Sequence, residues 1–254
     1  MTWKTQANAI WRICYFYGFL ALRRQPLLFI AIFLTPLSFL FFLYVVAPHS
    51  VLPYGVTGGI MFTALFTGNG MMTDCAYLRL ERQLQQIFVT SPLRPMSWIL
   101  GMALGELAWT IPAIGLFLFV LAIVVPIGAL SVVGLVGVVL LTWLLSTSLG
   151  FLLSTFFRQL REIWPIGAVV FTSLSVLPPV FYPIAAIPAT YRWVAFFSPS
   201  TFASQLADHA AGLVVPTISV LPGLSSIPVE VAGMVVLTLL FAVMAMRLAR
   251  WREP

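Results

Sequence analysis

Stretches of about twenty apolar residues recur along the whole of this 254-residue chain. A helix of about 20 residues crosses the hydrocarbon layer of a bilayer, which is roughly 30 Å thick. The composition agrees, because 61% of the residues are hydrophobic and only 8% are charged, whereas soluble domains carry about a quarter charged residues. The sequence therefore predicts an all-α polytopic membrane protein in which the spanning helices make up the fold.

Six of these stretches are predicted to cross the membrane. They cover residues 27–47, 55–74, 98–125, 130–157, 163–182 and 231–249. A cleaved signal peptide is the alternative for the first stretch, but this stretch is long, follows an amphipathic leader and precedes five more spans. We therefore expect a single transmembrane domain over residues 1–254, with spans one to five in 27–182 and the sixth in 231–249.

The basic residues predict which side of the membrane each loop faces, because Lys and Arg are retained in short cytoplasmic loops. With the amino terminus inside, twelve of the thirteen basic residues fall in cytoplasmic segments and only Arg192 falls outside. Both termini and the loop 75–96 are therefore predicted to be cytoplasmic. The net charge of +6 then reflects topology and contact with anionic lipid headgroups, and it gives no support for nucleic-acid binding. Cys14 and Cys75 fall on the cytoplasmic side and are expected to be free thiols.

The leader, residues 1–24, interleaves aromatic residues such as Trp11 and Phe16 with basic residues such as Lys4 and Arg12. Aromatic and basic side chains together are typical of the headgroup layer, so the leader is predicted to be a helix lying in the cytoplasmic interface. The alternative is that it simply extends the first span.

The segment 183–228 is predicted to lie outside and is interrupted by several prolines. Ser198 followed by Pro199 is typical of a helix start, and Gly212 is typical of a helix end. The resulting helix has Phe202, Leu206 and Ala210 on one side and Ser204, Gln205 and Asp208 on the other. Because it is too short to span, we expect short re-entrant or surface helices before the last span.

The sequence lacks the motifs of hydrolytic, redox and nucleotide chemistry. The only histidines are His49 and His209, and neither H-E-x-x-H nor G-x-S-x-G occurs. Lys4 is the only lysine and no glycine precedes it, so the chain has no P-loop. No catalytic or metal-ligating residue is therefore assigned, and any ATP-driven function requires a separate ATPase subunit.

Glu106 is the acid that the sequence places clearly inside a span, about eight residues or roughly 12 Å from its start. Acids inside the membrane often mark a transport path, and they usually find a partner. Two interpretations remain open: Glu106 lines the substrate pathway, or it forms a structural pair with an arginine at the membrane interface.

The cytoplasmic loop contains a second amphipathic segment, which runs from Tyr77 to Val89 and ends before Ser91-Pro92. Its apolar side carries Leu80, Leu84, Ile87 and Phe88, and charged or amide side chains occupy the other side. A short helix of this kind either coats the membrane surface or docks a partner protein.

Three motifs resemble the permease subunits of type-2 ABC exporters. They are the run from Glu81-Arg82 to Ser91-Pro92, the cluster Gly105-Glu106-Leu107-Ala108-Trp109, and the outer pattern Pro179-Val180-Phe181-Tyr182-Pro183, Ile187-Pro188, Ser198-Pro199. The cluster is most similar to exporters of lipo-oligosaccharides and of hydrophobic antibiotics, and polysaccharide exporters share much of the outer pattern. Many members have Gly-Thr after the acidic-basic pair, where this chain has Gln83-Leu84.

The resemblance implies a half-transporter in the plasma (inner) membrane of a bacterium or archaeon. Two permease chains, identical or homologous, would form the pathway, and two ABC ATPase subunits would bind their cytoplasmic face. ATP and magnesium would be used by those subunits, with no cofactor bound by this chain. The residues implied in ATPase coupling are Glu81, Arg82, Leu84, Gln85 and Phe88, and those implied in the substrate pathway or its support are Glu106 and Trp109.

A secondary transporter or channel without an ATPase is the alternative function. Such proteins are expected to show inverted repeats, broken helices near the middle of the membrane, or several polar groups inside spans. The sequence shows none of these features clearly, so the exporter permease is the favoured interpretation.

Overall fold

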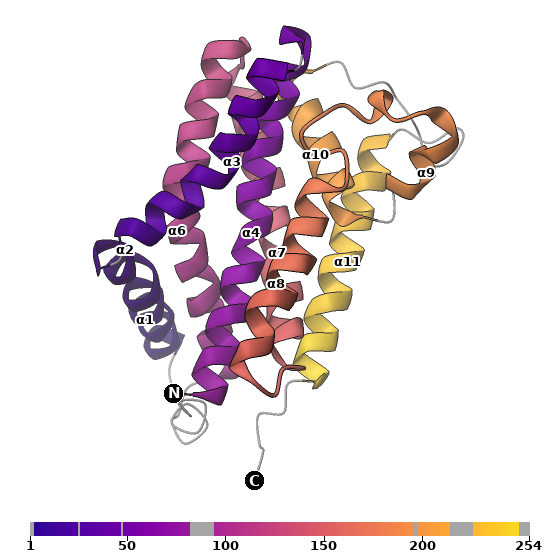
Figure 1. The fold of residues 1–254 in the computed structure, drawn as a ribbon. Helices are drawn as coiled ribbons and strands as arrows, with labels where there is room; N and C mark the ends of the chain where they lie inside the picture. Colours follow the sequence, from indigo (N-terminus) through magenta and orange to yellow (C-terminus); the bar gives the residue numbers. More distant parts are fainter. Residues whose placement is uncertain are drawn as a thin grey trace.

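The structure is a computed structural model that describes residues 3–24, 26–46, 48–81, 94–195, 198–213 and 226–248. Every regular element in these ranges is a helix (Figure 1), which confirms the all-α class. The elements are α1 (Trp3–Cys14), a π-helical segment (Tyr15–Leu20), α2 (Ala21–Arg24), α3 (Pro26–Val46), α4 (Leu52–Leu80), α6 (Pro95–Val124), α7 (Ala129–Ser154), α8 (Leu160–Val176), α9 (Arg192–Ala195), α10 (Pro199–Ala210) and α11 (Ser226–Leu248). Short 3₁₀ turns cover His49–Val51, Ile184–Ala186 and Ala189–Tyr191.

Among the described residues, four helical stretches are long and apolar enough to cross a membrane. They are His49–Leu80, Met96–Val124, Ala129–Ser154 and Ile227–Leu248. The structure therefore supports four of the six predicted spans, while the spans 27–47 and 163–182 stay predictions. The fifth helix is shorter than predicted, because α8 ends at Val176 and the chain turns at Pro178 and Pro179, where proline removes backbone donors.

The long helices alternate in direction, and α1 begins at the same end of the bundle at which α11 finishes (Figure 1). We call this end the basic end, because Arg79, Arg94, Arg158, Arg161 and Arg247 lie there at helix termini. The opposite end carries α9 and α10 and is called the α10 end. Both ends of the described chain thus share one side of the bundle, in line with the predicted topology.

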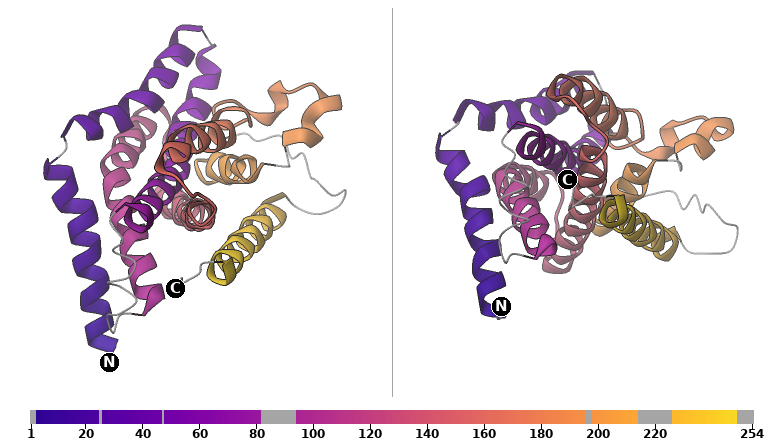
Figure 2. Two further views of the ribbon diagram at one scale, coloured as in Figure 1. Left: turned by 60° about the horizontal axis from the view of Figure 1, so that its bottom comes forward. Right: turned by 90° about the horizontal axis from the view of Figure 1, so that it is seen from below.

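Helix α4 lies at the centre and packs against α3, α6, α7, α8 and α10. Figure 2 shows α1 along one side of the bundle and α11 on another. The contact of α4 with α7 depends on small residues, since a Cβ on Gly150 would lie 2.0 Å from the carbonyl oxygen of Gly68. Two hydrogen bonds cross the same contact, between the Thr67 and Ser146 hydroxyls at 2.8 Å and from Ser146 to the Ala64 carbonyl at 3.0 Å. Close packing of small and hydroxyl side chains is the usual way to join helices in a membrane.

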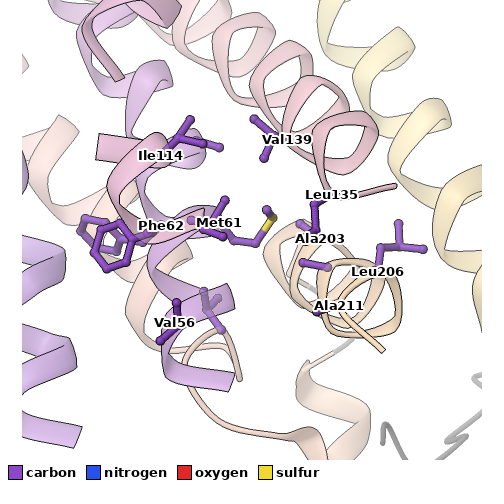
Figure 3. Close-up of a cluster of buried hydrophobic side chains, with 14 of the residues drawn as sticks. Val56, Met61, Phe62, Ile114, Leu135, Val139, Ala203, Leu206 and Ala211 are labelled. Carbon is purple, nitrogen blue, oxygen red and sulfur yellow. The ribbon is translucent and has the colours of Figure 1, made fainter. Parts of the chain in front are cut away.

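Apolar side chains fill the bundle toward the α10 end, where α10 is one wall of the core (Figure 3). Val56, Met61 and Phe62 of α4, Ile114 of α6, Leu135 and Val139 of α7, and Ala203, Leu206 and Ala211 in or beside α10 converge there. The polar side of α10 is buried as well, because Ser204, Gln205 and Asp208 are 5% exposed or less. Phe202 and Ala210, from the predicted apolar side, are only half-buried. Helix α10 therefore buries side chains of both its apolar and its polar side within the bundle.

The outward faces of several helices expose large apolar side chains, among them Leu130 of α7, Trp164 of α8 and Val236 of α11. Exposed apolar area of this extent marks contact with lipid or with another subunit. The fold thus presents an apolar exterior to a membrane, while α4 packs against the surrounding helices at its centre.

Candidate functional site

The leader packs along α6 through glycine residues of both segments. A Cβ on Gly18 would lie 2.9 Å from the Ala108 Cβ and 3.0 Å from the Gly105 carbonyl oxygen. A Cβ on Gly101 would lie 2.8 Å from the Ile13 Cβ. A larger residue at either position would push the two helices apart, which explains the glycines at 18 and 101.

Two side-chain hydrogen bonds fix this contact. Trp109 donates its indole N–H to the carbonyl oxygen of Tyr17 at 2.9 Å, and Tyr17 lies in the π-helical segment. Near the start of α6, Ser97 donates to the Gln6 amide oxygen at 2.7 Å. The leader is thus a separate helix docked on α6 rather than a straight extension of α3.

The opposite side of the leader is exposed and aromatic. Trp11, Tyr15, Phe16 and Phe19 are each between 45% and 61% exposed, and the Phe19 ring lies 6.4 Å from Trp11 and 6.3 Å from Tyr15 between centroids. The basic side chains of Lys4 and Arg12 are also exposed. This surface has the chemistry of a membrane interface, where aromatic rings sit among headgroups.

Glu106 faces away from the leader, toward α4. Its carboxylate lies over Gly70, where a Cβ would come within 2.0 Å of Glu106 Oε2. The carboxyl groups of Glu106 and Asp74 lie close enough to each other for a hydrogen bond. The structure therefore places a second acid, Asp74, against Glu106, a partner that the sequence analysis did not consider. Two carboxyl groups form such a bond only when one of them carries a proton.

Arg79 fixes the last turn of α4 to the end of α7. Its guanidinium donates to the carbonyl oxygen of Thr155 at 3.0 Å and to that of Phe157. These carbonyls follow the C-terminus of α7, where unsatisfied acceptors and the helix dipole favour a cation. The end of α4 is thus held by α7 through Arg79 and by α6 through the Asp74–Glu106 pair.

The predicted coupling residues begin at this end of α4. Glu81 directly follows α4 and is exposed, and its backbone N–H donates to the Tyr77 carbonyl at 3.0 Å. The other four, Arg82, Leu84, Gln85 and Phe88, lie outside the described residues. The structure therefore places Leu80 and Arg94, the described residues that flank the predicted coupling segment, at the basic end.

Sequence reasoning missed the partner of Glu106 and the burial of the cysteines. Asp74 ends one of the predicted spans, and only its position five residues before Arg79 indicates that it lies on the bundle side of that arginine. Cys14 and Cys75 are free thiols, as predicted, but both are buried.

One family model matches this architecture, that of the ABC-2 type transporter, over residues 10–207. The match includes the leader from Ile10 onward, the Asp74–Glu106 pair, the predicted coupling residues and most of α10. The chain belongs to the ABC-2 type transporter family. This confirms the resemblance of the three motifs to type-2 ABC permeases.

The permease is thus the membrane subunit of an ABC transporter and is not itself the catalytic subunit. No curated protein matches the chain.

Proposed function

We propose that this permease exports a hydrophobic or lipid-linked substrate, with ATP hydrolysed by two copies of a separate ABC ATPase subunit. The observation that carries the proposal is the family match over residues 10–207 in a chain whose only lysine, Lys4, belongs to no P-loop. The cluster from Gly105 to Trp109 supports a drug, lipo-oligosaccharide or polysaccharide as cargo, through its similarity to exporters of those classes.

The segment from Glu81 to Val89 is the proposed coupling helix, seated in a groove of the ATPase at the cytoplasmic face. It directly follows α4, whose last turns are joined to α7 by Arg79 and to α6 by the Asp74–Glu106 pair. A displacement of the segment would then move three packed helices together, because close-packed interiors transmit strain.

Glu106 and Trp109 act in this proposal as supports of the pathway. Glu106 packs on Gly70 and Asp74, while Trp109 is bonded to Tyr17 of the leader. Glu106 joins α6 to α4, and Trp109 joins α6 to the leader. Both side chains therefore support the helices that would form the pathway together with a second permease copy.

The basic end is proposed to face the cytoplasm, with six spans and both termini inside. Because both native cysteines are buried, the test uses a variant in which they are replaced by alanine. A cysteine at exposed Glu81 should then react with a membrane-impermeant maleimide only from the cytoplasm, and one at exposed Thr190 only from outside. Labelling of position 190 from the cytoplasmic side would overturn this topology.

The decisive experiment co-purifies the permease with its ATPase and measures transport in proteoliposomes. Phe88→Ala and Leu84→Ala should each reduce ATPase retention by on the order of tenfold or more and stop transport, as expected for buried anchors of about 2 kcal/mol or above. Leu130→Ala is the matched control, because this leucine is 86% exposed at the α10 end. Undiminished retention and transport in both loop variants would reject the coupling segment.

A further inference from the structure

Three polar side chains from three helices meet inside the α10 end. Asp208 of α10, Thr57 of α4 and Glu230 of α11 are 5%, 0% and 2% exposed. The Thr57 hydroxyl lies 2.5 Å from Asp208 Oδ1, and Glu230 is close enough for its charge to act on Asp208. Two acids are thus buried together where α10 joins the bundle.

The part of the chain that the structure describes places no lysine or arginine beside these acids. Arg192 is the one lysine or arginine between α8 and α11 in the sequence, and its guanidinium donates to the carbonyls of Ile187 at 2.8 Å and Ala185 at 3.1 Å. Residues 214–225 contain no ionisable side chain in the sequence.

The helices packed around α10 supply no cation either. Helix α7 contains no ionisable residue, and those of α8, Arg161 and Glu162, lie at its basic end. On α4 the nearest ionisable group is Tyr54, whose interaction with Asp208 is electrostatic. His209 follows Asp208 on α10, and burial lowers the pKa of its imidazole, which disfavours the charged form.

Buried carboxylates without a cation are costly, so these acids are neutral or bind a cation from solution. The hydrogen bonds around Thr57 favour a proton on Asp208 over a bound cation. Thr57 has a single hydroxyl proton but three acceptors in reach, since the carbonyls of Tyr54 and Pro53 lie 3.0 and 3.3 Å from its oxygen. A proton on Asp208 satisfies the contact with Thr57 while the hydroxyl donates to a carbonyl of its own helix.

The unpaired oxygens at this end agree with a neutral site. Glu230 Oε2 and Gln205 Oε1 are buried and accept no hydrogen bond from the residues that the structure describes. An unpaired atom is far less costly on a neutral carboxyl than on a carboxylate. In the part of the chain that the structure describes, no group of three His, Cys, Asp or Glu side chains could hold a metal ion.

We propose that Asp208, Thr57 and Glu230 form a proton-binding site that docks α10 onto α4 and α11. Burial raises the pKa of Asp208 to about 8. The hydrogen bond that Thr57 can donate to the ionised form opposes this rise, and the charge of Glu230 adds to it. The ordinary value for an aspartate is 3.8. The docked state therefore binds the proton more tightly than the released state. Docking is strongest at low pH and weakens as the pH rises toward 8, by at most about tenfold in the docking equilibrium per pH unit.

The test measures thermal unfolding of the purified full-length chain in lipid nanodiscs between pH 6 and 9, followed by tryptophan fluorescence. The wild-type Tm should fall across this range, whereas Asp208→Asn, which mimics the protonated acid, should flatten the profile. Glu230→Gln tests the site independently and should reduce the slope. Glu162→Gln, an acid at the opposite end of the bundle, is the matched control and should keep the wild-type slope.

Two results would overturn the proposal. One is an equal slope in the wild type and in both site variants. The other is a rise in the wild-type Tm at pH 9 on adding Na⁺, K⁺ or Ca²⁺ that is absent from Asp208→Asn, because the site would then hold a cation. Neither measurement involves the ATPase or transport, so the outcome is independent of the proposed export function.

Discussion

Adding one methyl group to Gly150 should separate the two central helices. The Cβ of Gly150→Ala would lie 2.0 Å from the Gly68 carbonyl oxygen and 2.8 Å from its carbonyl carbon. Real Cβ contacts essentially never fall below 3.0 Å, so α7 must withdraw from α4 by about 1 Å. The atoms that it meets are backbone, so no side-chain rotation relieves the clash.

The separation also stretches the hydrogen bonds from Ser146 to Thr67 and to the Ala64 carbonyl. Overpacking of a close contact costs about 1–3 kcal/mol, and each weakened hydrogen bond adds about 1 kcal/mol. A loss of about 3 kcal/mol corresponds to a fall in Tm of roughly 6–12 °C for a chain of this size.

The assay is the thermal unfolding of each purified variant in the same lipid nanodisc at one pH. Gly137→Ala is the matched control on the same helix, because nothing lies within 4 Å of its added Cβ. Alanine also has the higher helix propensity, so this variant should match or slightly exceed the wild type. If Gly150→Ala is as stable as Gly137→Ala, the close crossing of α4 and α7 is refuted.

Three further predictions concern α6 and the chain as a whole. Glu106→Gln should keep assembly, because the amide still donates to Asp74, and it should reduce export. Glu106→Ala should also lower the Tm, because Asp74 is left without its partner at a cost of about 1–3 kcal/mol. Wild-type export in both variants would contradict this prediction. Trp109→Phe should remove the bond to Tyr17 and increase hydrogen exchange in the leader, by about fivefold for a loss of about 1 kcal/mol, without changing exchange in α11. The purified permease alone should show no ATP turnover. Robust turnover free of contaminating ATPase would contradict the proposal that a separate subunit hydrolyses ATP.

The apolar runs predicted most of the helices, because length and composition alone distinguish a membrane span. Helices α4, α6, α7 and α11 all contain the predicted stretches to within a few residues. The error at the end of α8 came from counting the apolar residues 177–182 as helix, although Pro178 and Pro179 begin a turn there. Hydropathy measures burial in lipid and is insensitive to the backbone donors that proline removes.

The polar contacts were harder to predict, because they depend on how each helix is rotated about its axis. Asp74 and Glu106 are 32 positions apart in the sequence, and only the packing of α4 on α6 brings their carboxyl groups together. The burial of Asp208 could not be predicted either, since hydropathy places an acid outward. Its partner Thr57 belongs to a helix 151 positions away.

The π-helical segment Tyr15–Leu20 sets the angular phase of the leader relative to the first long helix. A π-helical turn accommodates one more residue than an α-helical turn, and one residue corresponds to about 100° of rotation in an α-helix. Deleting a single residue there would restore regular winding and rotate α1 about its axis by roughly that angle. Gln6 and Ile13 would turn away from α6, and the exposed rings of Trp11 and Phe16 would change direction. The leader is therefore far more sensitive to a change in its length than to most substitutions on its exposed surface.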